Sequence, residues 1–274
     1  MRSLGSIVQG RLGYFRQMVP HIGIASAALL QLAEDWNRLA RRLSLRWRVR
    51  QLHVCLEGYG APVAIRLGSS DIEVFRQVFV FQQYMPVTKL ESPTVIVDCG
   101  ANAGYSALFF LKHFPEARVI AVEPDPDNAE LCRHNLHPFL DRVVVIQKAL
   151  WGRVTKLSFV EESRRPGEEW GIQVQSTPTS SAEDAVEAID IPSLMEATDL
   201  TFIDILKIDI EKSEADVFQA NPTAWLHLVR NIAIELHGPT CTEAFRAALK
   251  GYSFSEEVCG EITLCLGMKP SLLT

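Results

Sequence analysis

The sequence lacks the patterns that mark metal ribbons, disulfide frameworks and membrane spans. Apolar residues cluster in 22–32, but this stretch contains Gly23, Ser26 and Gln31 and is shorter than the ~20 apolar residues that cross a bilayer. The cysteines form no C-x-x-C pair and show no zinc-site spacing, and they lie at positions 55, 99, 132, 241, 259 and 265. These absences favour a protein of a reducing cytoplasm in which unpaired thiols are ordinary core residues.

Lysine is absent from residues 1–50, where all basic charge is arginine. This segment has nine Arg against Glu34 and Asp35, whereas the rest of the chain has 18 basic and 31 acidic residues. The acidic body lacks the basic face that phosphate neutralisation requires, which argues against nucleic acid as a partner. A signal peptide, with arginines ahead of residues 22–30, is the less favoured alternative because nothing disulfide-rich follows it.

A G-x-G-x-x-G motif is also missing, and a different glycine pattern takes its place. Residues 95–106 indicate a buried strand, a small-residue loop and the start of a helix, with the pattern Asp98-x-Gly100-x-x-x-Gly104. A second strand then delivers Glu123, which suits a ribose diol. A carboxylate ahead of the first glycine would repel a pyrophosphate but suits a sulfonium. The spacing therefore indicates S-adenosylmethionine.

Each residue of this pattern has an expected role. Glu123 is the candidate ribose ligand, while Asp98 is expected to order the loop and face the cationic end of the cofactor. Asn102 either bonds the loop or contacts the methionine portion. Gly100 and Gly104 allow the backbone to approach the ligand closely. With one residue from the start of the helix and one from the end of the third strand, the candidate cofactor residues are Asp98, Gly100, Asn102, Gly104, Tyr105, Glu123 and Ala149.

Strands and helices alternate regularly from residue 93 onward, which predicts crossover connections and a parallel sheet. Two short alternating runs at 252–256 and 261–266 predict a closing antiparallel pair that turns at Gly260. The expected strands are 94–98, 118–122, 143–148, 205–209 and 231–236, and the expected helices lie near 105–113, 127–134, 214–220 and 243–249.

The N-terminal part is expected to be an extension of the α/β domain. Residues 22–50 predict a helix with an apolar stripe at three- and four-residue steps, formed by Leu29, Leu32, Trp36, Leu39 and Leu43. The helix is interpreted as a cap on the catalytic domain or, alternatively, as a basic surface for a membrane or a carrier protein. Two short strands, 52–56 and 63–67, and a helix start at Ser70 follow. The expected division is an extension, 1–62, and a catalytic domain, 63–274, with an inserted hairpin at about 153–190.

Polar residues fall at four of the five expected strand ends, where open parallel sheets bind their ligands. Asp209 ends the fourth strand, and Glu235 and His237 follow the fifth. This His–carboxylate set is the catalytic candidate. It could act as general base for a hydroxyl, or Asp209 and Glu235 could help to hold a divalent ion that lowers the hydroxyl pKa. A satisfied loop histidine is the structural alternative. Lys207, inside an apolar strand, is expected to pair with a carboxylate.

These motifs together resemble the FkbM-type family of S-adenosylmethionine-dependent methyltransferases. The resemblance rests on Asp98–Ser106, Val122–Asp125, Leu206–Glu211 and Ile234–His237, with likeness over about 63–238. It implies a Rossmann-like class I methyltransferase fold with a mostly parallel seven-stranded sheet and helices on both faces. It also implies O-methylation of a small-molecule acceptor such as a sugar, polyketide or other secondary metabolite. The chain departs from the family at Lys212, where glycine is common.

Two other classes of function are weighed against this one. A nicotinamide-dependent oxidoreductase should show G-x-G-x-x-G and a hydride-site pair, and neither is present. A non-catalytic or carrier-associated binding protein with this fold is expected to lose its cofactor acids, yet Asp98 and Glu123 are both retained.

Overall fold

A computed structural model of the chain describes residues 4–42, 51–163, 167, 169–176 and 185–271. The chain divides into two compact units, Met1–Gln82 and Gln83–Thr274. The second unit contains every candidate cofactor and catalytic residue. The predicted division into a 1–62 extension and a 63–274 domain stays a prediction.

The first unit begins with helix α1 (Leu4–Arg42), which starts well before the predicted helix over 22–50. Pro20 lies inside α1, and Gly23 has φ 78° and ψ 162°, so the helix is kinked there. Residues 43–50 of the predicted helix lie outside the described residues. No helix in the described part of the chain is long and apolar enough to cross a membrane.

The apolar stripe predicted on α1 is exposed to solvent. Leu32 is 67% exposed and Leu39 is 46% exposed, and Leu29 and Trp36 are similar. The buried face of the helix is offset from this stripe and consists of smaller residues, among them Ile22, Ala27, Leu30, Ala33 and Ala40. The helix therefore has two apolar faces, and the larger side chains are on the exposed one.

The remainder of the first unit is a strand pair and a helix. Strands β1 (Gln51–Val54) and β2 (Val63–Arg66) pair antiparallel, and α2 (Asp71–Phe79) begins directly after Ser70. The Ser70 side chain makes no capping hydrogen bond; the Asp71 N–H donates to Ser69 Oγ instead. The buried Asp71 carboxylate pairs with Arg66 at 2.7 Å, which ties the end of β2 to the start of α2.

The second unit is built on a seven-stranded sheet in the order β12-β13-β11-β10-β3-β4-β5. Five strands, β11-β10-β3-β4-β5, are parallel, and β13 is antiparallel to both of its neighbours. The predicted mostly parallel sheet is thus confirmed. The strands are β3 (Val95–Cys99), β4 (Arg118–Val122), β5 (Val143–Ile146), β10 (Ile205–Ile208), β11 (Ile232–Glu235), β12 (Tyr252–Cys259) and β13 (Ile262–Pro270).

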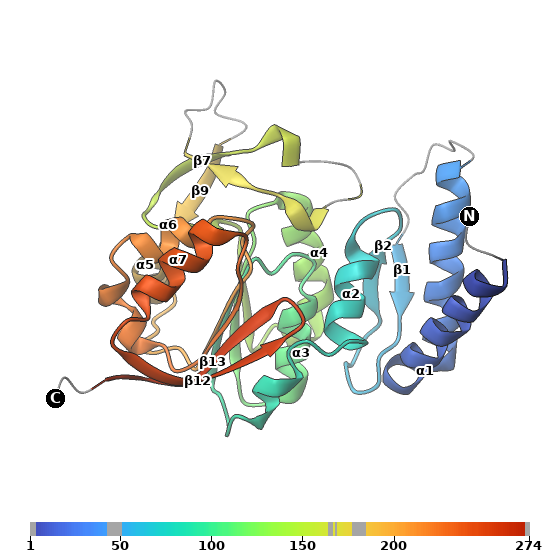
Figure 1. The fold of residues 1–274 in the computed structure, drawn as a ribbon, viewed down its shortest axis with the longest axis horizontal. Helices are drawn as coiled ribbons and strands as arrows, with labels where there is room; N and C mark the ends of the chain where they lie inside the picture. The colour runs from blue at the N-terminus through green and yellow to red at the C-terminus, as the bar shows by residue number, and fades with distance from the viewer. Residues whose placement is uncertain (1–3, 43–50, 164–166, 168, 177–184, 272–274) are drawn as a thin grey trace. The chain divides into compact units, whose positions relative to one another are not determined.

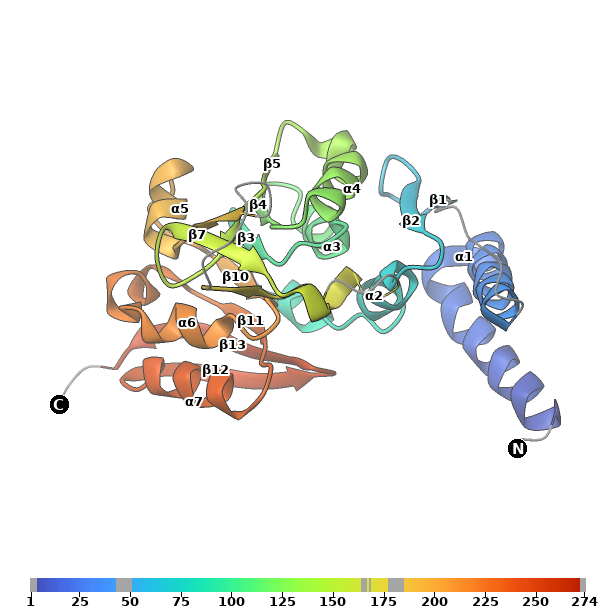
Figure 2. The ribbon, with the colours of Figure 1, turned by 90° about the horizontal axis from the view of Figure 1, so that it is seen from above.

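Helices cover both faces of this sheet (Figures 1 and 2). Helices α3 (Tyr105–His113) and α4 (Pro126–Leu136) lie on one face, and α5 (Ile191–Ala197), α6 (Glu214–Gln219) and α7 (Pro239–Ala248) lie on the other. The strands need near-continuous apolar sequence because both of their faces are buried. On the α5–α7 side, strand residues such as Leu206 pack with Phe218, Trp225 and Phe245.

A second, four-stranded sheet follows β5, in the order β6-β9-β7-β8. It consists of β6 (Ala149–Leu150), β7 (Thr155–Phe159), β8 (Val174–Gln175) and β9 (Ala185–Ile189). The predicted strand over 143–148 is too long: β5 ends at Ile146, and Ala149 starts β6, which pairs with β9 rather than with β4. The change of sheet takes place across Gln147 and Lys148, and the local sequence does not show that the next strand pairs with β9.

Candidate active site

Three residues of the loop after β3 have left-handed backbone conformations, with positive φ. Gly100, Asn102 and Gly104 have φ of 75°, 48° and 84°. A Cβ on Gly100 would lie 1.7 Å from the main-chain oxygen of Asp209, and one on Gly104 would lie 3.0 Å from Cys132 Sγ. The loop therefore passes so close to the chain after β10 that position 100 requires glycine.

Glu123, at the end of β4, holds this loop from the other side. Its two carboxylate oxygens accept from the Asn102 N–H at 2.8 Å and from the Asp125 N–H at 3.0 Å. The side chain is 5% exposed, and burial raises the pKa of Glu123 to about 7 although these N–H groups act to lower it. A carboxylate has about four acceptor sites. These two N–H groups and the Asn128 amide, at 3.5 Å, reach up to three of them, which leaves at least one for a hydroxyl of a vicinal diol.

The second sheet reaches this edge beside Glu123. The Asn128 side-chain amide donates to the main-chain oxygen of Glu169, in the turn Glu169–Gly171, at 3.2 Å and lies 3.5 Å from Glu123. Asn128 belongs to the first turn of α4, which Asp125 caps by accepting from two main-chain N–H groups. The same end of α4 therefore positions both the Glu123 carboxylate and a segment of the second sheet.

Asp98 is fully buried beneath the glycine loop. One of its oxygens accepts from Ser106 Oγ at 2.6 Å, and the other lies 3.2 Å from Lys207 Nζ. Lys207 also donates to the main-chain oxygen of Gly100 at 2.7 Å, and it lies 3.7 Å from Asp209. Burial opposes its charge, but the Asp98 and Asp209 carboxylates outweigh that effect and raise the pKa of Lys207. The expected lysine–carboxylate pair thus orders the loop.

Two other candidates are also buried. Tyr105 is the first residue of α3 and is 1% exposed. Ala149, 2% exposed, packs with Trp151 and Leu157 in the second sheet. Their contact with the cofactor stays a prediction.

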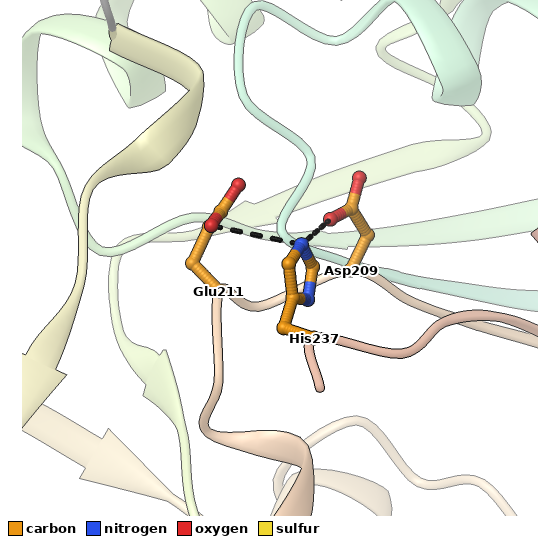
Figure 3. A group of neighbouring side chains, drawn as sticks. All are labelled: Asp209, Glu211 and His237. Atoms are coloured by element: carbon orange, nitrogen blue, oxygen red, sulfur yellow. Dashed lines mark ion pairs between the residues drawn. The ribbon is translucent and has the colours of Figure 1, made fainter. Parts of the chain in front are cut away.

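The ends of β10 and β11 bring together the three catalytic candidates and one further carboxylate, Glu211. Figure 3 shows His237 with Asp209 and Glu211. The Nε2 atom of His237 lies 3.5 Å from Glu235, 3.6 Å from Glu211 and 3.9 Å from Asp209. These side chains lie close together because β10 and β11 are neighbouring parallel strands, and both strands end at the same edge of the sheet.

The other ring nitrogen of His237 contacts a residue that sequence reasoning missed. Glu214 accepts from His237 Nδ1 at 2.9 Å and from the Ile210 N–H at 3.1 Å, and its side chain is fully buried. A carboxylate that starts a helix ordinarily faces solvent and the helix dipole. The sequence offered one indication of a role for Glu214, which is that it follows Glu211 by three residues. The course of the turn between them cannot be predicted from the sequence.

The clustered charges shift one another's ionisation. Burial opposes the charge of His237, but the hydrogen bond to Glu214 and the surrounding carboxylates raise the pKa of His237 to about 9. Burial and the Asp209 charge raise the pKa of Glu235 to about 7, and burial raises that of Glu211 to about 7. The site therefore concentrates negative charge that is only partly neutralised.

The departure from the family pattern at Lys212 has a backbone consequence. Lys212 has φ 81° and Glu211 has φ 52°, both in the left-handed region. Glycine adopts such a conformation without steric cost, whereas a side chain is strained there. The Lys212 side chain is exposed, and its main-chain oxygen accepts from Cys241 Sγ at 3.5 Å.

The strand order, with one antiparallel strand next to a parallel set and a glycine loop after the central strand β3, defines a class I methyltransferase. Residues 98–258 match the model of the methyltransferase FkbM domain, and the chain belongs to that family. The protein is an S-adenosylmethionine-dependent methyltransferase, as the motifs predicted.

Several known proteins are similar to this chain. It is 30% identical to the 2-O-methyltransferase NoeI of Sinorhizobium fredii (strain NBRC 101917 / NGR234), over 64% of this chain and 70% of the relative. It is 25% identical to the methyltransferase sdnD of Sordaria araneosa, over 61% of this chain and 75% of the relative. The precorrin-6y C5,15-methyltransferase structure from Geobacter metallireducens GS-15 matches with a TM-score of 0.41 at 13% identity, over 72% and 87% of the two chains.

The residues at the glycine loop fit S-adenosylmethionine. Gly100 lets the loop pass against the main chain of Asp209, which a side chain at this position would prevent. The buried Oδ1 of Asn102 has no hydrogen-bond partner among the described residues, so it is available to an ammonium or a hydroxyl donor. Glu123 keeps at least one acceptor site for a hydroxyl of a diol.

Proposed function

We propose that the protein transfers a methyl group to a hydroxyl of a small-molecule acceptor, such as a sugar, a polyketide or another secondary metabolite. The observation that carries this proposal is the convergence of Asp209, Glu235 and His237 next to the glycine loop. The main chain of Asp209 touches the loop at Gly100, so a catalytic candidate adjoins the cofactor segment directly. The name of the relative NoeI, a 2-O-methyltransferase, supports an oxygen acceptor.

The chemistry requires positioning and removal of one proton. S-adenosylmethionine supplies the methyl group on a sulfonium, which is a good leaving group. A bond forms between the acceptor oxygen and the methyl carbon as the sulfur–carbon bond breaks, and S-adenosylhomocysteine is released. The hydroxyl proton passes to a carboxylate of the set formed by Asp209, Glu235 and His237, because the raised pKa of about 9 leaves the His237 ring protonated near neutral pH. Glu214 fixes the orientation of the imidazole through Nδ1.

Two segments are proposed to shape the acceptor side. The 153–190 insertion, which contributes β7, β8 and β9 of the second sheet, reaches the site edge through the hydrogen bond from the Asn128 amide to the main-chain oxygen of Glu169. The N-terminal extension, residues 1–62, is proposed as a cap or substrate-side element.

We also propose that α1 contacts an anionic membrane surface. Its exposed Leu29, Leu32 and Leu39, together with the nine arginines of residues 1–50, suit such a surface. Co-pelleting with anionic vesicles at low salt tests this, with Leu32→Glu as the variant that should weaken it. No binding to anionic vesicles at low salt would contradict the membrane contact and leave a carrier protein as the alternative partner.

The test of oxygen transfer uses labelled S-adenosylmethionine and a panel of hydroxylated acceptors. Label should appear in a product that carries a new methyl ether, and His237→Ala should lower turnover by about 10²- to 10⁴-fold with little change in cofactor affinity. Transfer only to nitrogen or carbon acceptors, or unchanged turnover in His237→Ala, would contradict the proposal.

A further inference from the structure

We propose that Asp209, Glu211 and His237 form a binding site for a divalent cation. Its ligands would be two carboxylates and one imidazole, with Glu235 as a neighbouring carboxylate. Carboxylate oxygen suits Mg²⁺ and Mn²⁺, and an imidazole nitrogen in the set favours Mn²⁺ over Mg²⁺. Of these two cations, Mn²⁺ is therefore expected to bind more tightly.

The spacing of the ligand atoms agrees with a coordination sphere. One ligand atom from each of the three side chains lies within 4.8 Å of the other two, and His237 Nε2 lies 3.6 Å from Glu211 and 3.9 Å from Asp209 (Figure 3). Metal–ligand bonds of ~2.0–2.2 Å place pairs of ligand atoms about 3 to 4.3 Å apart. Small side-chain rotations therefore suffice to close the site around an ion.

The histidine is held in the orientation that a metal ligand needs. Metal-binding imidazoles ordinarily donate their second N–H to a carboxylate. Here His237 Nδ1 lies 2.9 Å from Glu214, which is fully buried and whose other oxygen, Oε2, has no hydrogen-bond partner among the described residues. With Nδ1 occupied, Nε2 is the nitrogen that faces the three carboxylates. Glu214 therefore holds both the turn after β10, through the Ile210 N–H, and the orientation of the His237 ring.

The charge around the site also needs a cation. Asp209, Glu211 and Glu235 surround one imidazole at 3.5 to 3.9 Å. Two lysines lie near this set in the described residues. Lys207 is 3.7 Å from Asp209 and is bound instead to Asp98 and Gly100, and the side chain of Lys212, next to Glu211, is exposed to solvent. A divalent ion would offset carboxylate charge that the protein leaves uncompensated.

The role of the ion rests on the proposed function, whereas its binding does not. At this edge of the sheet it would hold the acceptor oxygen and lower the pKa of the hydroxyl. A protein that methylates another atom would still bind Mn²⁺ here, so the two proposals fail separately.

The test is a calorimetric titration of the full-length, chelator-treated protein with Mn²⁺, in the absence of any acceptor. We expect about one Mn²⁺ per chain, at least tenfold weaker binding by Asp209→Asn and His237→Ala, and about 10- to 100-fold weaker binding by Glu214→Gln. Glu130→Gln, which removes an exposed carboxylate on α4, is the matched control and should bind as the wild type does.

Each variant is also titrated with S-adenosylmethionine, and retained cofactor binding shows that it is folded. If Asp209→Asn fails to fold, paramagnetic broadening of the His237 ring-proton signals by Mn²⁺ in the wild-type protein decides the question. The proposal is overturned if the wild type binds none of Mn²⁺, Mg²⁺ and Zn²⁺. It is equally overturned if Asp209→Asn and His237→Ala bind Mn²⁺ as tightly as the wild type.

Discussion

The ammonium nitrogen of Lys207 lies 3.2 Å from the Asp98 carboxylate, and both side chains are almost completely buried. The two residues are register partners on the neighbouring strands β10 and β3, and Lys207 also bonds the oxygen of Gly100. The pair thus joins the centre of the sheet to the cofactor loop.

Replacing Lys207 by methionine should destabilise the protein strongly. The substitution leaves Asp98 buried without its counter-charge, which costs about 3–5 kcal/mol of unfolding free energy. Chemical denaturation measures this loss. Lys250→Met, at an exposed position, is the control and should change stability by less than about 0.5 kcal/mol. Equal losses in the two variants would contradict the structural role of the buried pair.

Gly100→Ala should abolish cofactor binding or folding. The new methyl group would meet the main-chain oxygen of Asp209 at 1.7 Å, at a backbone φ of 75°. The methyl group and the Asp209 oxygen can separate only if the loop or the chain at the end of β10 moves. Gly13→Ala, where nothing lies within 4 Å, is the control and should leave cofactor affinity unchanged. Wild-type affinity in Gly100→Ala would show that the loop is placed differently.

Lys212→Gly should stabilise the protein. The left-handed backbone at φ 81° strains a lysine, and glycine removes about 1 kcal/mol of that strain. Lys212→Ala keeps the strain and serves as the comparison in a thermal melt. A gain that is the same in both variants would indicate that the lysine charge, rather than the backbone, is responsible.

Cofactor affinity should rise as the pH increases from 6 to 8. Burial raises the pKa of Glu123 to about 7, so its carboxyl is protonated below that value and offers fewer acceptor sites to the ribose. We expect the dissociation constant to fall about tenfold over this range and then to level off. Glu123→Gln should bind weakly with a flat pH profile, and a sloping profile in that variant would assign the dependence to another group.

The same shift has a consequence for the stability of the ligand-free protein. Because the folded pKa is raised above the unfolded value, the protonated carboxyl stabilises the fold at low pH. This contribution is complete below about pH 4.5 and is lost as the pH rises through 7. The difference in unfolding free energy between wild type and Glu123→Gln should follow this course.

The sheet was predictable because strand and helix alternate in the sequence, and because Asp98, Glu123, Asp209 and Glu235 each end an apolar run. The pairing of β10 with β3 shows what this reasoning cannot predict. Register between β3 and β10 brings Lys207 opposite Asp98, and no local pattern contains that information. Glu214 was missed because its contact with His237 also joins residues far apart in the sequence, which no local pattern reveals.

Periodicity also left the orientation of α1 undetermined. The helix carries two apolar stripes about one residue apart, one with Leu30 and Ala33 and one with Leu29 and Leu32. A hydrophobic pattern identifies the stronger stripe, but tertiary packing decides which of them is buried, and here it is the one with smaller residues.

A calorimetric titration with S-adenosylmethionine tests the account most directly when wild type, Glu123→Ala and His237→Ala are compared. The account assigns cofactor binding to the β3–β4 edge and acceptor chemistry to the β10–β11 edge. It therefore predicts micromolar binding by wild type and His237→Ala and no measurable binding by Glu123→Ala. Full binding by Glu123→Ala, or loss of binding by a folded His237→Ala, would contradict this division of the site.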